Sequence, residues 1–209
     1  METLYQGIRH RLSKDLPGFS AHEKMLVPGR KARSAKIKPN PRISAVLLML
    51  YEDNDILHFP LILRPKYDGV HGGQMALPGG GIEAQDTDLE ATALRESFEE
   101  IGYTVPKTQV LGQLTPFYIP PSNSMVTPYV AYTTEKPRYN IDPKEVDRVV
   151  IADIHTLQNP DNHTTKLIDL PNGQQLHAPA YLVDGEIVWG ATAMILAEFL
   201  HVFDDVYVN

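Results

Sequence analysis

The chain has 209 residues, a length that favours one domain with added segments over two complete domains. Hydrophobic residues make up 43% of the sequence, enough for an ordinary globular core, and the formal net charge of −7 argues against nucleic acid as a general partner. The absence of cysteine excludes disulfide bonds, thiolate metal sites and cysteine nucleophiles.

Hydropathy gives no sign of a membrane or secretory protein. The N-terminal residues lack the apolar core of a signal peptide, and the longest apolar run, residues 45–51, is too short to span a bilayer. We therefore expect a soluble, cytoplasmic protein with no membrane partner.

The first 40 residues differ from the rest of the chain. Residues 2–12 predict a short helix, after which prolines and glycines interrupt the pattern. No acidic residue lies between Glu23 and Glu52, and this interval contains a basic segment, Arg30, Lys31, Arg33, Lys36 and Lys38. The basic segment is either a solvated linker or a positive wall facing a phosphate-rich ligand. We predict that residues 1–40 form an N-terminal extension packing on the core, and that residues 41–209 form the main domain.

The main domain reads as strands followed by packing helices. Residues 43–50 and 58–64 predict two strands joined by a polar turn, and their nearly continuous apolar character indicates burial on both faces. Further strands are expected at 110–114, 126–132 and 148–154, hairpin turns at Asn172-Gly173 and Asp184-Gly185, and a final helix at 191–203. This order predicts an α+β layered domain.

A glycine-rich segment followed by a helix carries the strongest functional signal. Gly79-Gly80-Gly81 lets the backbone approach a ligand closely and adopt conformations that other residues avoid. The helix should begin at a capping box with Thr87 as N-cap and Glu90 reaching back, and it should end at Gly102.

Two faces of this helix are expected to differ. One arc should pack on the core through Ala91, Leu94, Phe98 and Ile101. The opposite, exposed arc gathers Glu96, Glu99 and Glu100, which repel one another unless a divalent cation binds. Arg95 lies four residues before Glu99 and can orient it, or bind a nearby carbonyl. Considered alone, carboxylates at this spacing on a helix more often form a solvated acidic surface than a metal site.

These residues resemble a Nudix box. Its pattern of Gly, five residues, Glu, seven residues and Arg-Glu-apolar-x-Glu-Glu-x-Gly-apolar fits residues 81–103, with the core at 95–103. Three positions depart from it: Thr87 stands where the first Glu belongs, and Ser97 and Tyr103 replace aliphatic residues.

Within the Nudix hydrolases, the sequence is most similar to the coenzyme A pyrophosphatases, which commonly depart at the Thr87 position too. The resemblance spans roughly residues 40–203, with matching segments at Leu63-Arg64, 71–80, 92–96, 126–130, Glu145-Val146 and 189–193. The coenzyme A signature itself is altered, because Pro65 replaces a small residue, Gly69 an Arg and Leu77 a Phe.

The resemblance implies an α/β/α sandwich with a mixed central sheet, and a site for Mg²⁺ or Mn²⁺. By analogy, Glu96 and Glu100 are primary metal ligands, Glu99 is a further ligand, and a carbonyl near Gly79 or Gly80 completes the site. The metal would neutralise diphosphate charge and lower the pKa of a bound water that attacks one phosphorus in line. From coenzyme A, the products would be 4′-phosphopantetheine and adenosine 3′,5′-bisphosphate.

Several further roles follow from the same resemblance. The general base is Glu96 or Glu145, although Glu145 also reads as a surface residue. Arg64 and His71 are expected to contact phosphate, or else to organise their loops, and Tyr129 to line the groove or pack in the core.

Other functions stay open at this point. One is a Nudix hydrolase acting on ADP-ribose or another nucleotide sugar or dinucleotide, and the other is a non-catalytic regulatory domain that binds a nucleotide. A homodimer is expected only by analogy with relatives.

Overall fold

The computed structural model describes residues 2–27, 36–66, 72–169 and 175–207. His71, Gly69 and the Asn172-Gly173 turn, together with the part of the basic segment before Lys36, lie outside the described residues, so the predictions for them stay untested.

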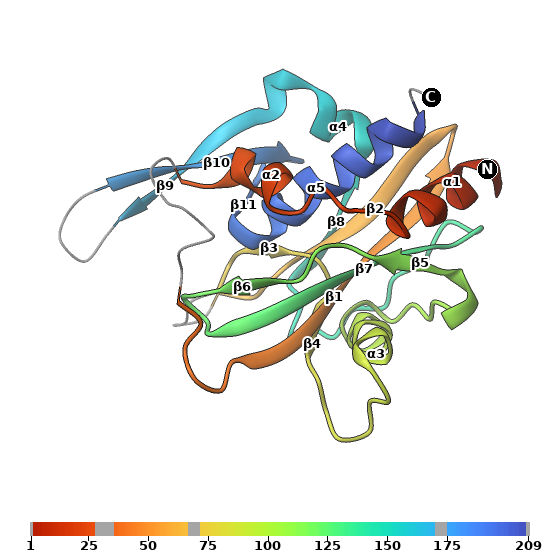
Figure 1. The fold of residues 1–209 in the computed structure, drawn as a ribbon, viewed down its shortest axis with the longest axis horizontal. Coiled ribbons are helices and arrows are strands. Elements are labelled where there is room, and N and C mark those ends of the chain that lie inside the picture. The colour runs from red at the N-terminus through yellow and green to blue at the C-terminus, as the bar shows by residue number, and fades with distance from the viewer. Residues whose placement is uncertain (1, 28–35, 67–71, 170–174, 208–209) are drawn as a thin grey trace.

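A mixed sheet forms the centre of the molecule, as the sequence predicts (Figure 1). Its middle strand, β1 (Arg42–Asp53), runs parallel to β7 (Ser124–Tyr132), whereas the other pairings in this sheet are antiparallel. The remaining strands are β2 (Ile56–Leu63), β3 (Met75–Ala76), β4 (Gly79–Gly81), β5 (Val110–Gln113), β6 (Phe117–Ile119) and β8 (Arg148–Asp153).

The hairpin between β1 and β2 confirms the predicted polar turn. Asn54 and Asp55 both have positive φ angles, 53° and 61°, as a two-residue hairpin turn requires. Along β1, Leu48 and Leu50 face one hydrophobic cluster while Leu47 and Met49 face another, so the strand is buried on both faces.

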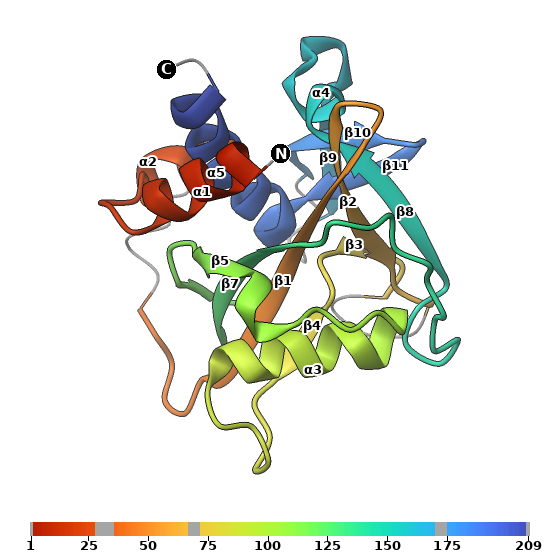
Figure 2. The ribbon, with the colours of Figure 1, turned by 90° about the vertical axis from the view of Figure 1, so that its right-hand side faces the viewer.

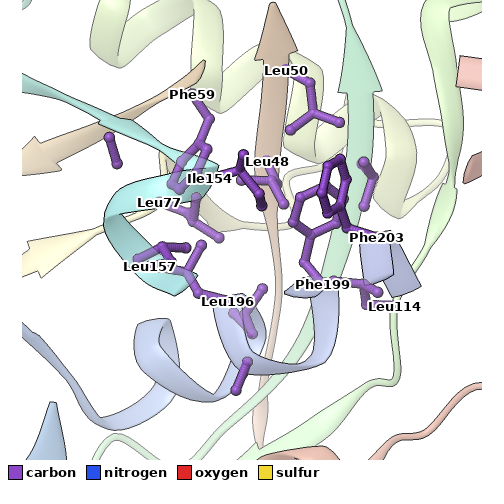
Figure 3. Packing of buried hydrophobic residues seen from close by; sticks show 14 of the residues in the cluster. Leu48, Leu50, Phe59, Leu77, Leu114, Ile154, Leu157, Leu196, Phe199 and Phe203 are labelled. Atoms are coloured by element: carbon purple, nitrogen blue, oxygen red, sulfur yellow. The ribbon is translucent and has the colours of Figure 1, made fainter. Parts of the chain in front are cut away.

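Helices cover both faces of the sheet, which gives the expected α/β/α sandwich (Figure 2). Helix α3 (Leu89–Ile101) lies on one face, and α5 (Gly190–Tyr207) lies with α1 (Glu2–Leu12) on the other. Figure 3 shows the larger core cluster, in which Leu48 and Leu50 meet Phe199 and Phe203 of α5. The short helices are α2 (Phe19–His22), η1 (Glu23–Met25), η3 (Lys107–Gln109), α4 (Ile154–Gln158) and η4 (Pro160–Asn162).

A second, three-stranded sheet precedes α5. It consists of β9 (His163–Asp169), β10 (Gln175–Val183) and β11 (Glu186–Trp189) in antiparallel order. The predicted Asp184-Gly185 turn joins β10 to β11, with φ angles of 48° and 78°. Strand β11 runs directly into α5, and this junction brings Trp189 and the first turn of α5 to the cleft described below.

The predicted N-terminal helix is confirmed as α1, and it packs against α5 and β5. Tyr5 stacks on Tyr132 with ring centroids 4.3 Å apart, and Arg11 forms a 2.7 Å ion pair with Asp205. The division into an extension and a main domain at residue 40 stays a prediction. Every helix in the described ranges is too short or too polar to cross a membrane.

Helix α3 corrects two predictions about its start and its faces. Its N-cap is Asp88, whose side chain accepts a hydrogen bond from the Ala91 N–H, rather than Thr87. Phe98, predicted to be in the core, is 52% exposed, while Glu100, predicted to be exposed, is 1% exposed. The reason lies beneath the helix: α3 packs against both β1 and the glycine strand β4, so Ala93, Ser97 and Glu100 face the sheet and the bulky Phe98 is turned away. The αL stop at Gly102 is confirmed, with a φ angle of 69°.

Candidate active site

A cleft of about 650 Å³ lies where β1 changes partner, from β4 at Ser44–Val46 to β2 at Tyr51–Asp53. Strand ends, the β3–β4 segment, α3, the loop before β8 and the β11–α5 junction all contribute to its walls. Its acidic residues are Glu83, Glu96, Glu99, Glu100 and Glu145, and its basic residues are Arg42, Arg64 and Lys144. The cleft therefore carries more negative than positive side chains, beside an apolar wall that includes Trp189 and Ile195.

The glycines of β4 make the close packing at the cleft possible. Gly79 has a φ angle of 154°, and a Cβ there would collide with the carbonyl oxygen of Ala45. A Cβ at Gly80 would meet the carboxylate of Glu96. In the structure, the group that lies against the backbone at Gly80 is a carboxylate of α3, and the predicted approach of a ligand to these glycines stays a prediction.

Arg95 organises the acidic side of the cleft. Its guanidinium forms a bidentate pair with Asp86, at 2.9 Å to each oxygen, and donates to the Gly81 carbonyl at 3.0 Å. It also donates to Glu96 at 3.0 Å and to Glu99 at 2.8 Å, so the predicted contacts with Glu99 and with a neighbouring carbonyl are confirmed. The hydrogen bonds from Arg95 hold the pKa of Asp86 well below its usual range.

Glu100 is the most deeply buried carboxylate of the cleft. Its Oε2 accepts a 2.8 Å hydrogen bond from the Gly79 N–H, and its Oε1 lies 3.5 Å from the guanidinium of Arg64. Burial raises the pKa of Glu100 to about 8, against the opposing effects of Arg64 and the Gly79 N–H. The charges of Glu96 and Glu145 raise it further, which places both carboxylates close to Glu100.

Glu96 shares this electrostatic environment. Burial raises its pKa, Arg95 opposes the shift, and the negative charges of Glu99 and Glu145 add to it. Glu96 therefore interacts electrostatically with Glu99, Glu100 and Glu145 across one cleft.

The carboxylates are not preassembled around a metal position. Among the residues that the structure describes, no three acidic, histidine or cysteine side chains converge tightly enough to form a ready-made metal site. The donor set nevertheless fits a hard divalent cation, because Mg²⁺ and Mn²⁺ prefer carboxylate oxygens. Burial raises the pKa values of Glu96 and Glu100 and the charges of neighbouring glutamates add to it; such a cation would stabilise the charged form of both.

Most of the other predicted site residues reach the cleft. Arg64, Gly79, Gly80 and Glu145 line it. Tyr129 does not: it packs in the hydrophobic cluster beneath α3, because strand residues alternate and it is Val126 of the same strand that faces the cleft.

Several charged residues at the site were not predicted as site residues from the sequence, among them Asp86 and Arg42. Asp86 stands in an irregular loop nine positions before Arg95, where no periodic pattern pairs the two. Arg42 opens β1, and only the pairing of β1 with β4 brings it beside Gly81.

A family comparison agrees with this geometry. The family model for the NUDIX domain matches residues 41–169, which include β1, the glycine strand and the whole of α3. The chain is a Nudix hydrolase.

Curated relatives of this Nudix hydrolase include named diphosphatases. The mitochondrial coenzyme A diphosphatase NUDT8 of Mus musculus is 31% identical over 184 residues, which cover 85% of this chain and 86% of the relative. The protein of the same name from Homo sapiens is 30% identical over 165 residues, covering 78% of this chain and 70% of the relative. An uncharacterized Nudix hydrolase NudL from Photorhabdus laumondii is 30% identical over 172 residues, covering 77% and 84%.

A solved structure supports the fold. A MutT/nudix family protein from Enterococcus faecalis superposes with a TM-score of 0.57 at 20% identity, covering 82% of this chain and 65% of that one. Some relatives are named mitochondrial or chloroplastic, so the cytoplasmic location of this Nudix hydrolase stays a prediction, as does a homodimer.

Proposed function

We propose that this Nudix hydrolase cleaves the diphosphate linkage of coenzyme A or its derivatives, releasing 4′-phosphopantetheine and adenosine 3′,5′-bisphosphate. The observation that carries the proposal is the 31% identity to a coenzyme A diphosphatase over 86% of that relative, a span that includes more than the catalytic helix. The share is large enough to take in the strands and loops that form the other walls of the cleft.

The acidic side of the cleft is where the reacting diphosphate would lie. Glu96 and Glu100 would hold the divalent cation, with Glu99 as a further ligand, and the cation would neutralise diphosphate charge and supply a polarised water. Arg95 fixes Glu96 and Glu99 in place through its hydrogen bonds at 3.0 and 2.8 Å. The remaining hydrogen bonds of Arg95 go to the Asp86 carboxylate and the Gly81 carbonyl, which are also protein groups. In this proposal Arg95 is therefore a positioning residue.

Glu145 and Arg64 would act from the other walls. Glu145 lines the cleft and raises the pKa of both Glu96 and Glu100, which puts a second carboxylate within electrostatic reach of the reacting centre. It is therefore a candidate for accepting a proton from the attacking water, alongside Glu96. Arg64 would contact a phosphate oxygen while still balancing the charge of Glu100 at 3.5 Å.

The apolar wall suits the uncharged arm of coenzyme A. Trp189 from β11, Ile195 from α5 and Ile119 from β6 line the same cleft as the carboxylates. A pantetheine arm, with or without an acyl group, would bury its carbon chain on such a surface, whereas the second half of ADP-ribose is a polar sugar phosphate.

A substrate panel tests the proposal. Coenzyme A, an acyl derivative, ADP-ribose, NADH and a dinucleoside polyphosphate would each be incubated with Mg²⁺ or Mn²⁺, and the products identified by mass. We expect coenzyme A or its acyl derivative to have the highest kcat/KM, with no turnover in EDTA. ADP-ribose ranking first would contradict the proposed substrate and leave the family unaffected. Binding of a nucleotide without turnover of any compound would instead indicate a regulatory domain.

A further inference from the structure

Arg42 stands at the outer end of the cleft in an unusual position. An ideal Cβ built on Gly81 would lie 2.7 Å from Arg42 Nε and 2.8 Å from its Nη2. The guanidinium therefore rests directly on the backbone of β4, where only glycine leaves room for it. The carbonyl oxygen of Gly81 accepts a 3.0 Å hydrogen bond from Arg95. Gly81 therefore lies between two arginines that have different surroundings.

The backbone of Arg42 is fixed from both sides. Its N–H donates to the Asn123 carbonyl at 2.8 Å, and its position in β1 is paired with Ser124 of β7. The adjoining residues of β1 pair with β4, Ser44 opposite Gly81. The side chain thus starts from a strand with hydrogen-bonded neighbours and lies over the backbone of β4.

The guanidinium of Arg42 has donors to spare. Arg64 is engaged by Glu100 and by the Gly79 carbonyl, and Arg95 by three carboxylates. Within the described ranges, no side chain or carbonyl accepts a hydrogen bond from the Arg42 guanidinium, although the cleft holds five carboxylates. The Arg42 side chain is exposed, so a ligand in the cleft can reach its donors.

The nearby hydroxyl groups do not offer an alternative donor. Ser44 donates its Oγ–H to the Met125 carbonyl at 3.2 Å, and Ser124 donates to the Ser122 carbonyl at 3.3 Å. Arg42 therefore offers its donors to an anion in the cleft, and its planar fork matches two oxygens of a phosphate.

We propose that Arg42, held over Gly81, binds a phosphate group of the substrate. This inference rests on the proposed function only in taking the substrate to be coenzyme A. Coenzyme A carries phosphate groups at two places, the reacting diphosphate and the 3′-phosphate of the ribose. Arg42 contributes to binding in either case.

Kinetics with Arg42→Gln test the proposal. We expect kcat/KM for coenzyme A to fall about tenfold, as for the loss of a charge-assisted hydrogen bond. Dephospho-coenzyme A, which lacks the 3′-phosphate, separates the two sources: a loss confined to coenzyme A assigns the 3′-phosphate, and an equal loss on both compounds assigns the diphosphate. Arg138→Gln removes the same charge from an exposed residue that does not line the cleft, and it controls for net charge. Values for Arg42→Gln that match those of Arg138→Gln on both substrates would overturn the proposal.

Equilibrium binding keeps this test independent of the proposed function. Calorimetry in EDTA would measure the Kd of ADP, which carries a diphosphate, and of adenosine 3′,5′-bisphosphate. We expect Arg42→Gln to weaken at least one of them about tenfold, even if the wild-type protein fails to hydrolyse coenzyme A. Unchanged Kd values for both compounds would overturn the role of Arg42, whatever the substrate panel shows.

Gly81→Ala tests the placement itself. Gly81 does not have a positive φ angle, so an alanine is free of backbone strain there, and its methyl group displaces the guanidinium. We expect a loss of about tenfold in the wild-type background and less than about twofold in the Arg42→Gln background, because the two changes act on one interaction. Equal losses in both backgrounds would show that Gly81 does not act through Arg42.

Discussion

Among the residues whose burial the structure describes, Glu198 and Glu100 are the two buried glutamates, and their surroundings differ sharply. Glu198 of α5 is 0% exposed, and its two oxygens accept hydrogen bonds from His22 at 2.8 Å, the Thr115 hydroxyl at 2.6 Å and the Gly18 N–H at 3.1 Å. Glu100 of α3 is 1% exposed and accepts one hydrogen bond, from the Gly79 N–H, with Arg64 at 3.5 Å.

The difference fits a structural role for Glu198 and the metal-binding role proposed for Glu100. Glu198 has donors on both oxygens and connects the N-terminal segment to α5 inside the core. Glu100 is under-satisfied and lies near other negative charges, so burial raises its pKa to about 8. A buried carboxylate kept short of donors, facing a cleft, is stabilised when a cation arrives.

The strongest test of this comparison is the loss of the cleft carboxylates. In Glu96→Gln and Glu100→Gln, we expect kcat for the best substrate to fall about 10³-fold, close to 4 kcal/mol of transition-state stabilisation. The fold should persist, because glutamine has the same shape and can still accept the N–H of Gly79 in place of Glu100. Steady-state kinetics with Mg²⁺ and Mn²⁺, together with thermal melts, provide the measurement.

Glu90→Gln is the matched control for these variants. Glu90 lies in the first turn of the same helix, pairs with Lys107 at 3.4 Å and does not line the cleft. Its variant should keep wild-type kinetics. Full metal-dependent activity in Glu96→Gln or Glu100→Gln would show that the replaced glutamate does not have the proposed role.

The opposite outcome is expected at Glu198. In Glu198→Ala, the donors from His22, Thr115 and Gly18 lose their acceptor inside the core, so we expect a loss of about 3 kcal/mol in the free energy of unfolding. For a chain of this length, that lowers the melting temperature by roughly 9 °C. Well below the melting temperature, kcat should stay within about twofold of wild type, because Glu198 is outside the cleft. A rate loss without a stability loss would place Glu198 with the functional carboxylates.

The smallest expected effect concerns an exposed carboxylate. Asp88 caps α3 through the Ala91 N–H at 2.7 Å, so Asp88→Ala should cost about 1 kcal/mol of stability. Thermal melts should show a decrease of about 3 °C, with kcat unchanged. Thr87→Ala, one residue earlier, should leave the melting temperature unaltered; a larger loss for Thr87→Ala would return the N-cap to the position first predicted from the sequence.

Regular patterns made most of the fold predictable. The strands at 43–50 and 58–64, the turn between them, the final helix and the end of α3 at Gly102 all have local signatures, and the structure confirms them. The grouping of Glu96, Glu99 and Glu100 with Arg95 was predictable because they lie within a few residues of one another on one helix. Asp86 and Arg42 were not, since strand pairing and loop geometry alone bring them to Gly81 and Arg95.

The sequence by itself determined the family, the order of the elements and the residues of the acidic helix, because the motifs and periodic patterns that indicate them lie within short stretches of the chain. Only the tertiary structure decided which carboxylate is buried. Glu100 faces inward and Phe98 outward because of how α3 packs on β1 and on the glycine strand β4, a surface that periodicity along the helix does not reveal. Whether a residue is buried depends on the element that packs against it as well as on the residue itself, and the fold determines which element that is.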